Sequence, residues 1–336
     1  MNNWEKIDKL EIENNISISC FRTKQEIISE HYNLGIIFSS LESRALEYGK
    51  LFSGKTFDRT LLVKFDFKEK DNLKNDLENY QKLKKISKKG PIVINNLILE
   101  NIKYNIKKII INIPKESLNL NSRWFLDMTG APLVYSIAIL GFLKKIFPAP
   151  NIHLLNVSGI YKNSDVINNF TKGFNEDIWI PFFIGKPDFK SPSLYIFLLG
   201  FEGDRALSIY KKCDPVYVKA IIADPGYCEG YKKIALKKNR YFLKEVNIEP
   251  RSVTTADVGN PIEVFKKVKK IVNRYKKSYE KINTVFVPVG PKPHALGAAI
   301  GAIEDSTISI LYEIPLSYTL KEVERGNYIW LYEINF

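Results

Sequence analysis

The chain has few of the residues that build disulfide frameworks and metal centres. It has 336 residues but only three cysteines and three histidines. Cys20, Cys213 and Cys228 show no pairing pattern, and no histidine lies near them at metal-ligand spacing. The simplest interpretation is a reduced, cytoplasmic protein that uses neither a disulfide nor a metal. We expect no cofactor.

Long apolar segments are also absent. The most apolar predicted helix, 134–143, is about half as long as a membrane-spanning helix. The first residues lack the basic segment and apolar segment of a secretory signal. We therefore expect a soluble, intracellular protein without a membrane partner. The sequence has no Gly-x-Gly-x-x-Gly and no His-x-x-x-His, so neither of these dinucleotide and metal motifs indicates its chemistry.

Positive charge is in excess, with a formal net charge of +13. A basic surface attracts polyanions such as nucleic acids. Much of the charge falls in runs such as 82–85 and 266–270, where apolar residues recur at helical spacing. Two interpretations stay open: solvated helix faces, or a nucleic-acid-binding surface on the Lys-rich helices around 74–89 and 262–281.

The most informative feature that is present is an internal repeat. Segment 34–46 aligns with 194–207 after one inserted residue, and 125–132 aligns with 285–292. Three matched pairs are each 160 residues apart: Glu42 and Glu202, Gly130 and Gly290, and Gly141 and Gly301. A repeat of this length predicts two copies of one domain, packed as an intramolecular pseudo-dimer about an approximate two-fold axis.

The length and the 45% hydrophobic content allow two cores, in domains of about 155 residues each. In both copies, continuous apolar strands alternate with helices. This pattern predicts the α/β class, with two tandem Rossmann-like domains and mainly parallel sheets. The predicted divisions are an N-terminal arm over 1–33, a first domain over 34–162, a linker over 163–192 and a second domain over 193–336.

Polar residues gather where the opening strand of each copy gives way to a helix. In an open parallel sheet, such junctions offer unpaired N–H groups and the positive ends of helix dipoles. Arginine there can hold a phosphate, and glutamate can accept from a ribose hydroxyl or a base amine. A local ion pair or helix cap is the alternative. The candidates are Ser39, Ser40, Glu42 and Arg44, with their counterparts Gly200, Glu202 and Arg205.

A second pair of junctions contains Thr129 and Gly130 in the first copy and Gly290 and Lys292 in the second. Glycine lets a ligand approach the backbone closely, and a proline in the first turn leaves later N–H groups available to an anion. Lys292 adds a positive charge where a phosphate would lie. A plain Gly/Pro turn with a solvated lysine is the alternative.

A third junction contains Asp224 and Gly226, matched by 65–67 in the first copy. An Asp after the second strand contacts the ribose in several nucleotide-binding sheets, but Asp-Pro-Gly is also a turn signal. His294 is the one histidine at such a junction. With Asp224 and Glu202, it is a candidate acid or base, although no nucleophile lies near it in the sequence.

The strand-Thr-Gly-helix segment at 127–143 and the strand-Gly-x-Lys-helix segment at 285–302 resemble the signature of CRISPR-associated Rossmann fold (CARF) sensor domains. The resemblance implies recognition of a cyclic oligonucleotide or similar nucleotide signal at a two-fold interface, commonly in antiviral defence. It assigns ligand binding to Thr129, Gly130, Gly290 and Lys292. The first copy lacks the lysine of the signature and the second lacks the threonine, which argues against symmetric binding.

The leading hypothesis is a nucleotide-type ligand-binding sensor or regulatory subunit of a multi-protein system, such as an antiphage defence system. The repeats occupy most of the chain, so we expect the effector to be a partner protein. One alternative is a nucleotide-processing hydrolase or transferase that uses the same cleft. Another is a structural or nucleic-acid-binding subunit.

Overall fold

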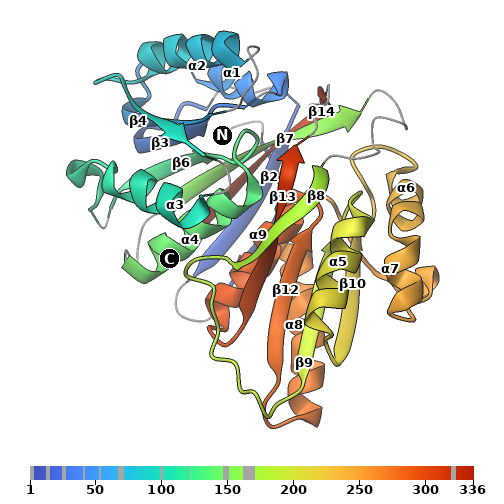
Figure 1. Cartoon of the computed structure of the whole chain (residues 1–336). Coiled ribbons are helices and arrows are strands. Elements are labelled where there is room, and N and C mark those ends of the chain that lie inside the picture. The colour runs from blue at the N-terminus through green and yellow to red at the C-terminus, as the bar shows by residue number, and fades with distance from the viewer. Residues whose placement is uncertain are drawn as a thin grey trace. The chain divides into compact units, whose positions relative to one another are not determined.

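The computed structural model describes residues 4–12, 16–24, 28–40, 42–52, 54–66, 72–98, 101–119, 121–146, 151–161, 171–318 and 323–336. The chain divides into two compact units. Unit 1 comprises Met1–Lys162 and Glu322–Phe336, and unit 2 comprises Asn163–Lys321. Each unit is a sheet accompanied by helices (Figure 1).

The sheet of unit 1 has the strand order β1-β2-β14-β7-β6-β3-β4-β5. Strands β3 to β7 run parallel, and β1, β2 and β14 are antiparallel to their neighbours. The strands are β1 (Glu5–Glu11), β2 (Ser17–Thr23), β3 (Tyr32–Phe38), β4 (Phe57–Phe65), β5 (Pro91–Leu97), β6 (Arg123–Asp127), β7 (Asn151–Tyr161) and β14 (Val323–Asn335). The helices are η2 (Ser43–Leu46), α1 (Tyr48–Leu51), α2 (Asn72–Ile86), α3 (Ile102–Ile111), η3 (Lys115–Ser117) and α4 (Leu133–Ile146).

The sheet of unit 2 has the order β11-β10-β9-β12-β13-β8, and β8 is the antiparallel strand. The strands are β8 (Thr171–Trp179), β9 (Ser193–Leu199), β10 (Tyr217–Ala223), β11 (Thr254–Ala256), β12 (Asn283–Val289) and β13 (Ser309–Tyr318). The helices are α5 (Gly203–Cys213), α6 (Tyr231–Lys238), α7 (Arg240–Glu245), η4 (Pro250–Ser252), α8 (Pro261–Ser278) and α9 (Lys292–Glu304).

The two units each contain a parallel core with the same strand order. Its spatial order is β5-β4-β3-β6-β7 in unit 1 and β11-β10-β9-β12-β13 in unit 2, so the strands follow one another along the chain in the same way. The central strands β9 and β12 are buried over all but their first residue, as expected for strands covered on both faces. The predicted α/β class with Rossmann-like, mainly parallel sheets is confirmed. Packing of the copies as a pseudo-dimer stays a prediction.

Aromatic side chains fill the cores. In unit 1, the Phe52 ring meets Phe57 and Phe125 edge-on, with centroids 4.7 and 5.0 Å apart. In unit 2, Phe197 of β9 lies 4.7 Å from Phe242 of α7. Such pairs stabilise a core beyond the apolar area that they bury. Among the described residues, no helix has both the length and the apolar character needed to cross a membrane.

Each parallel core is completed by an antiparallel strand that follows the other copy in the sequence. β14 follows β13 along the chain but pairs with β7, and β8 follows β7 but pairs with β13. The predicted divisions therefore differ from the structure. The expected linker, 163–192, contains β8, and the C-terminal strand, expected in the second domain, belongs to the sheet of unit 1. Apolar patterns identify strands but do not identify their pairing partners, which lie far away in sequence.

The expected arm over 1–33 contributes β1 and β2 to the unit 1 sheet, where β2 pairs with β14. One edge of this sheet thus depends on both ends of the chain. β14 carries a run of buried side chains: Ile329, Trp330, Leu331, Tyr332 and Ile334.

We expect removal of residues 322–336 to unfold unit 1 while unit 2 stays folded. Each large buried side chain contributes about 1.5–3 kcal/mol, so the loss from β14 is comparable to the about 5–15 kcal/mol that stabilises a whole domain. Calorimetry of the chain 1–321 should show one transition, which the fragment 163–321 should reproduce. Two transitions at the wild-type temperatures in the chain 1–321 would contradict this account.

Candidate functional site

The predicted site residues lie at the carboxyl ends of the parallel strands. In each unit, the strand order reverses between two central neighbours, β3 and β6 or β9 and β12. Open α/β sheets bind their ligands beside such a reversal, outside the carboxyl ends of the strands. The strand-to-helix junctions that contain the predicted residues lie at this edge of each sheet.

The glycines at the two reversals have a structural reason. A Cβ on Gly130 would lie 2.6 Å from the backbone oxygen of Phe38, at the end of β3. A Cβ on Gly290 would lie 2.7 Å from the backbone oxygen of Leu198, and one on Gly200 would lie 2.7 Å from Gly290 Cα. In unit 1, the loop after β6 thus packs against the backbone of β3. In unit 2, the loop after β12 packs against the backbone of β9 in the same way. Close backbone packing accounts for these glycines without a ligand.

The two arginines make equivalent contacts. Arg44 Nε donates to Glu42 Oε2 (2.6 Å), and its Nη1 donates to the Val157 backbone oxygen of β7. Arg205 Nη1 donates to Glu202 Oε2 (2.7 Å), and its Nη2 donates to the Glu313 backbone oxygen of β13. The ion pair that the sequence left as an alternative is thus present in both units. Each guanidinium also connects the start of a helix to the last parallel strand of its core along the chain, β7 or β13. A phosphate contact by either arginine stays a prediction.

Unit 2 surrounds its arginine with charges that the sequence analysis missed. Glu313 is fully buried, and its Oε1 accepts from Ser208 Oγ (2.8 Å) and Lys212 Nζ (2.9 Å). Lys212 also pairs with Asp177 of β8 at 3.2 Å. Burial raises the pKa of Glu313, and Lys212 opposes that rise. One signal was available, because Glu313 is the only charged residue in β13.

Two hydroxyl groups at the unit 1 edge, those of Thr129 and Ser40, form hydrogen bonds within the fold. Thr129 is buried, and its Oγ1 accepts from the Val157 N–H (3.0 Å). Its own N–H donates to Asp127 Oδ1 (2.8 Å). Ser39 is buried, and Ser40 Oγ accepts from the Glu42 N–H at 3.2 Å. These bonds stabilise the two turns, so this edge offers a ligand less polar surface than the sequence suggested.

The edge of unit 2 differs around α9. This helix of 13 residues begins at Lys292 and has no side-chain cap. The neighbouring α8 is capped, because Asn260 Oδ1 accepts from the Ile262 and Glu263 N–H groups at 3.0 and 3.2 Å. Lys292 is half-buried at the reversal between β9 and β12. A cation and an uncapped helix N-terminus thus occur together here.

His294 lies in the first turn of α9 and is fully buried. Its Nε2 lies 3.1 Å from the Asp257 backbone oxygen, in the loop that precedes α8. Because a carbonyl can only accept, Nε2 carries the proton and Nδ1 keeps its lone pair. Nδ1 has no hydrogen-bond partner among the described residues. Burial lowers the pKa of His294 to about 4, against the effect of its backbone hydrogen bonds.

Asp224 follows β10, and its carboxylate is 38% exposed and pairs with Lys232 Nζ at 2.6 Å. Its N–H donates to the backbone oxygen of Ala256, the last residue of β11. In unit 1, the Asp66 N–H contacts Leu97, the last residue of β5, in the same way, whereas Phe67 lies outside the described residues. Gly226 lies against Tyr231, since a Cβ there would be 3.0 Å from the Tyr231 Cβ.

One segment has the spacing of a phosphate-binding loop. Residues 49–56 read Gly-Lys-Leu-Phe-Ser-Gly-Lys-Thr, which matches the pattern Gly-x-x-x-x-Gly-Lys-Thr. That motif requires a strand before the loop and a helix after it. Here the segment begins within α1 and β4 follows it. The order is reversed, so the fold excludes a phosphate-binding loop of this kind.

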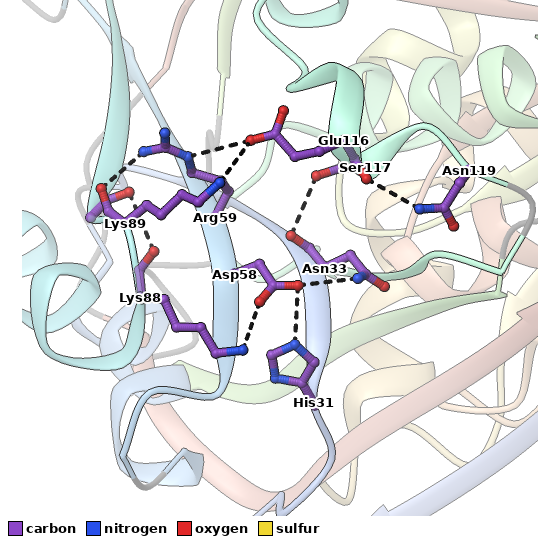
Figure 2. A network of polar contacts seen from close by, with 11 residues as sticks. His31, Asn33, Asp58, Arg59, Lys88, Lys89, Glu116, Ser117 and Asn119 are labelled. Atoms are coloured by element: carbon purple, nitrogen blue, oxygen red, sulfur yellow. Dashed lines mark hydrogen bonds and ion pairs between the residues drawn. The ribbon is translucent and has the colours of Figure 1, made fainter.

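A polar network lies at the opposite, amino edge of the unit 1 sheet (Figure 2). Asp58, at the start of β4, contacts Lys88 Nζ (2.8 Å), His31 Nε2 (3.1 Å) and Asn33 Nδ2 (3.1 Å). Partial burial alone would raise the pKa of Asp58, but its bonds to Lys88 and His31 lower it below the ordinary value. Because ligands bind at the carboxyl edge of such sheets, we infer that this network stabilises the fold and does not bind a ligand.

Comparisons with known proteins assign no family. No protein-family model and no curated protein matches the chain. Among solved structures, the chain is similar to the cytoplasmic domain of a prokaryotic cation chloride cotransporter. The identity is 10%, over 85% of this chain and 96% of that one, with a TM-score of 0.24. A similarity of this size supports no inference about function.

We expect Gly290→Ala to destabilise unit 2, because the added methyl group would enter the backbone of β9. Overpacking of this kind costs about 1–3 kcal/mol. Gly301→Ala is the matched control, since its Cβ would lie at an ordinary 3.4 Å from Phe286 and Val268. Chemical denaturation should show a lower free energy of unfolding for Gly290→Ala. For Gly301→Ala, the free energy of unfolding should be unchanged or slightly higher. Equal effects would contradict the packing explanation.

His294 should make the stability of unit 2 depend on pH. Its pKa is about 4 in the folded chain, below the ordinary value of 6.5, so the unfolded state binds more protons between these values. Stability is therefore complete above about pH 6.5 and falls as the pH drops, by about 2 kcal/mol at about pH 5. In denaturation curves of His294→Gln, this loss of stability between about pH 6.5 and about pH 5 should be absent. An unchanged pH dependence in the variant would refute the assignment.

Proposed function

We propose that the chain is a sensor or regulatory subunit that binds a nucleotide-type ligand at the carboxyl edge of the unit 2 sheet. The observation that carries the proposal is the position of Lys292 at the strand reversal between β9 and β12. Lys292 is the first residue of α9, which has no side-chain cap. An ammonium group and a helix N-terminus both attract phosphate. The buried Nδ1 of His294, in the same turn, is a hydrogen-bond acceptor that has no hydrogen-bond partner among the described residues.

Neighbouring groups fit the rest of a nucleotide. The Asp224 carboxylate follows the second parallel strand, where such sheets contact the ribose. The rings of Phe201 and Tyr231 are partly exposed and meet edge-on at 5.3 Å, which suits contact with a base. Unit 1, whose hydroxyls are used internally, would act mainly as a scaffold. This asymmetry agrees with the incomplete CARF-like signature of each copy.

The resemblance to CARF sensor domains supports a cyclic oligonucleotide as the ligand and antiviral defence as the setting. A sensor needs an output, so the proposal includes an effector protein as partner. The alternative of a nucleotide-processing enzyme has less support. A histidine with a pKa of about 4 is protonated too rarely near neutral pH to be an effective acid. Glu202 and Asp224 each form an ion pair.

Titration calorimetry with ATP and with cyclic di-, tri- and tetra-adenylate tests the proposal. We expect at least one of them to bind and Lys292→Ala to weaken it about tenfold or more, because a charge-assisted hydrogen bond contributes about 1.5–3 kcal/mol. Lys276→Ala is the control, since it removes the same charge from α8, where Lys276 pairs with Asp305. Binding of none of these compounds, or equal losses in both variants, would count against the proposal.

A further inference from the structure

The solvent face of α6 and α7 forms a surface that the nucleotide site does not use. The two helices are joined by continuous backbone bonds, from the Asn239 N–H to Ala235 (3.0 Å) and from the Leu243 N–H to Asn239 (2.8 Å). Their inner face is buried through Ala235, Phe242 and Leu243. The Asn239 side chain donates to the Gly200 backbone oxygen at 2.7 Å. These contacts join α6 and α7 to the rest of unit 2, and the opposite face of the two helices is directed to solvent.

That face carries a stripe of cations. Lys233, Lys237, Arg240 and Lys244 are all exposed. Lys233 and Lys237 lie four residues apart in α6, and Arg240 and Lys244 lie four residues apart in α7, so each pair lies on one side of its helix. None of the four forms an ion pair with a carboxylate of the described residues. Exposed cations that are not neutralised in this way are complementary to a polyanion.

An exposed aromatic ring lies within the stripe. Tyr241 is 58% exposed. The Arg240 guanidinium carbon lies 4.3 Å from the centroid of that ring, and Arg240 Nη2 donates to Tyr241 Oη at 3.1 Å. The guanidinium thus packs against this ring. Aromatic rings between cations are the usual stacking platform for unpaired bases.

We propose that the α6–α7 face binds single-stranded nucleic acid, DNA or RNA. The four cations contact successive phosphates, and Tyr241 stacks on a base. An acidic protein or an anionic lipid surface would use the cations but would not need the ring. The stripe differs from the Lys-rich helices that the sequence suggested. In α8, Lys270, Arg274 and Lys277 form an equally exposed row, but Tyr275 of that helix packs against Tyr217 at 5.0 Å.

Fluorescence anisotropy with labelled oligo-dT and oligo-U of about 20 nucleotides tests the proposal. The full chain should bind at least one of them at low salt. Lys237→Gln/Arg240→Gln/Lys244→Gln should weaken binding about tenfold or more and reduce the salt slope by about 2, at about 0.7 per phosphate contact. The control Lys270→Gln/Arg274→Gln/Lys277→Gln removes the same charge and should change affinity less than about threefold. Tyr241→Leu should weaken binding about fivefold or more, whereas Tyr241→Trp should retain it.

Three results would overturn the proposal: no binding at low salt, equal losses in the two triple variants, or wild-type binding by Tyr241→Leu. Equal losses in the two triple variants would mean that net charge, and not this surface, attracts the oligonucleotide. Wild-type binding by Tyr241→Leu would mean that no base stacks on this ring. Thermal unfolding of each variant shows whether the fold is intact. Lys237→Gln/Arg240→Gln/Lys244→Gln should bind the nucleotide ligand of the unit 2 edge as wild type does, so this experiment and that on the nucleotide site fail independently.

Discussion

The fold depends on covering the outer edge of each parallel core. The last core strand, β7 or β13, is apolar and would expose unpaired backbone groups if nothing paired with it. In both units, the partner is an antiparallel strand that follows the other copy in the sequence. Ion pairs reinforce this arrangement, from Glu47 to Arg325 of β14 at 3.3 Å and from Lys212 to Asp177 of β8 at 3.2 Å. Arg44 and Arg205 add a second tie, to the backbone of the last core strand.

The two units have this arrangement of strands and arginines in common, but the residues around it differ. The Arg44 guanidinium contacts Val157, whose cross-strand partner is Ile329. In unit 2, the corresponding contact is Glu313, whose cross-strand partner is Asp177. The second junction differs as well, because Thr129 is buried and bonded in unit 1 whereas Lys292 opens a helix in unit 2. At these two positions unit 1 is the more apolar copy and unit 2 the more charged one, and for this reason we propose the ligand site in unit 2.

Much of the core could be predicted from sequence, because buried parallel strands are continuous apolar runs and the repeat showed each junction twice. The partners of β8 and β14 could not be predicted, since pairing depends on contacts between residues far apart in sequence. The roles of Gly130 and Gly290 were also ambiguous, because a glycine that admits a ligand and one that admits a neighbouring backbone look alike in sequence. Glu313 was missed because its burial and its contact with Lys212 exist only in the folded chain.

The central claim is that the carboxyl edge of unit 2 holds a nucleotide-type ligand. Native mass spectrometry of the full chain purified from its natural source, followed by denaturation of the same sample, tests this claim most directly. The account predicts an added mass that is released as a nucleotide and is lost in Lys292→Ala. A chain that carries no added mass, or that keeps the nucleotide in Lys292→Ala, would contradict it.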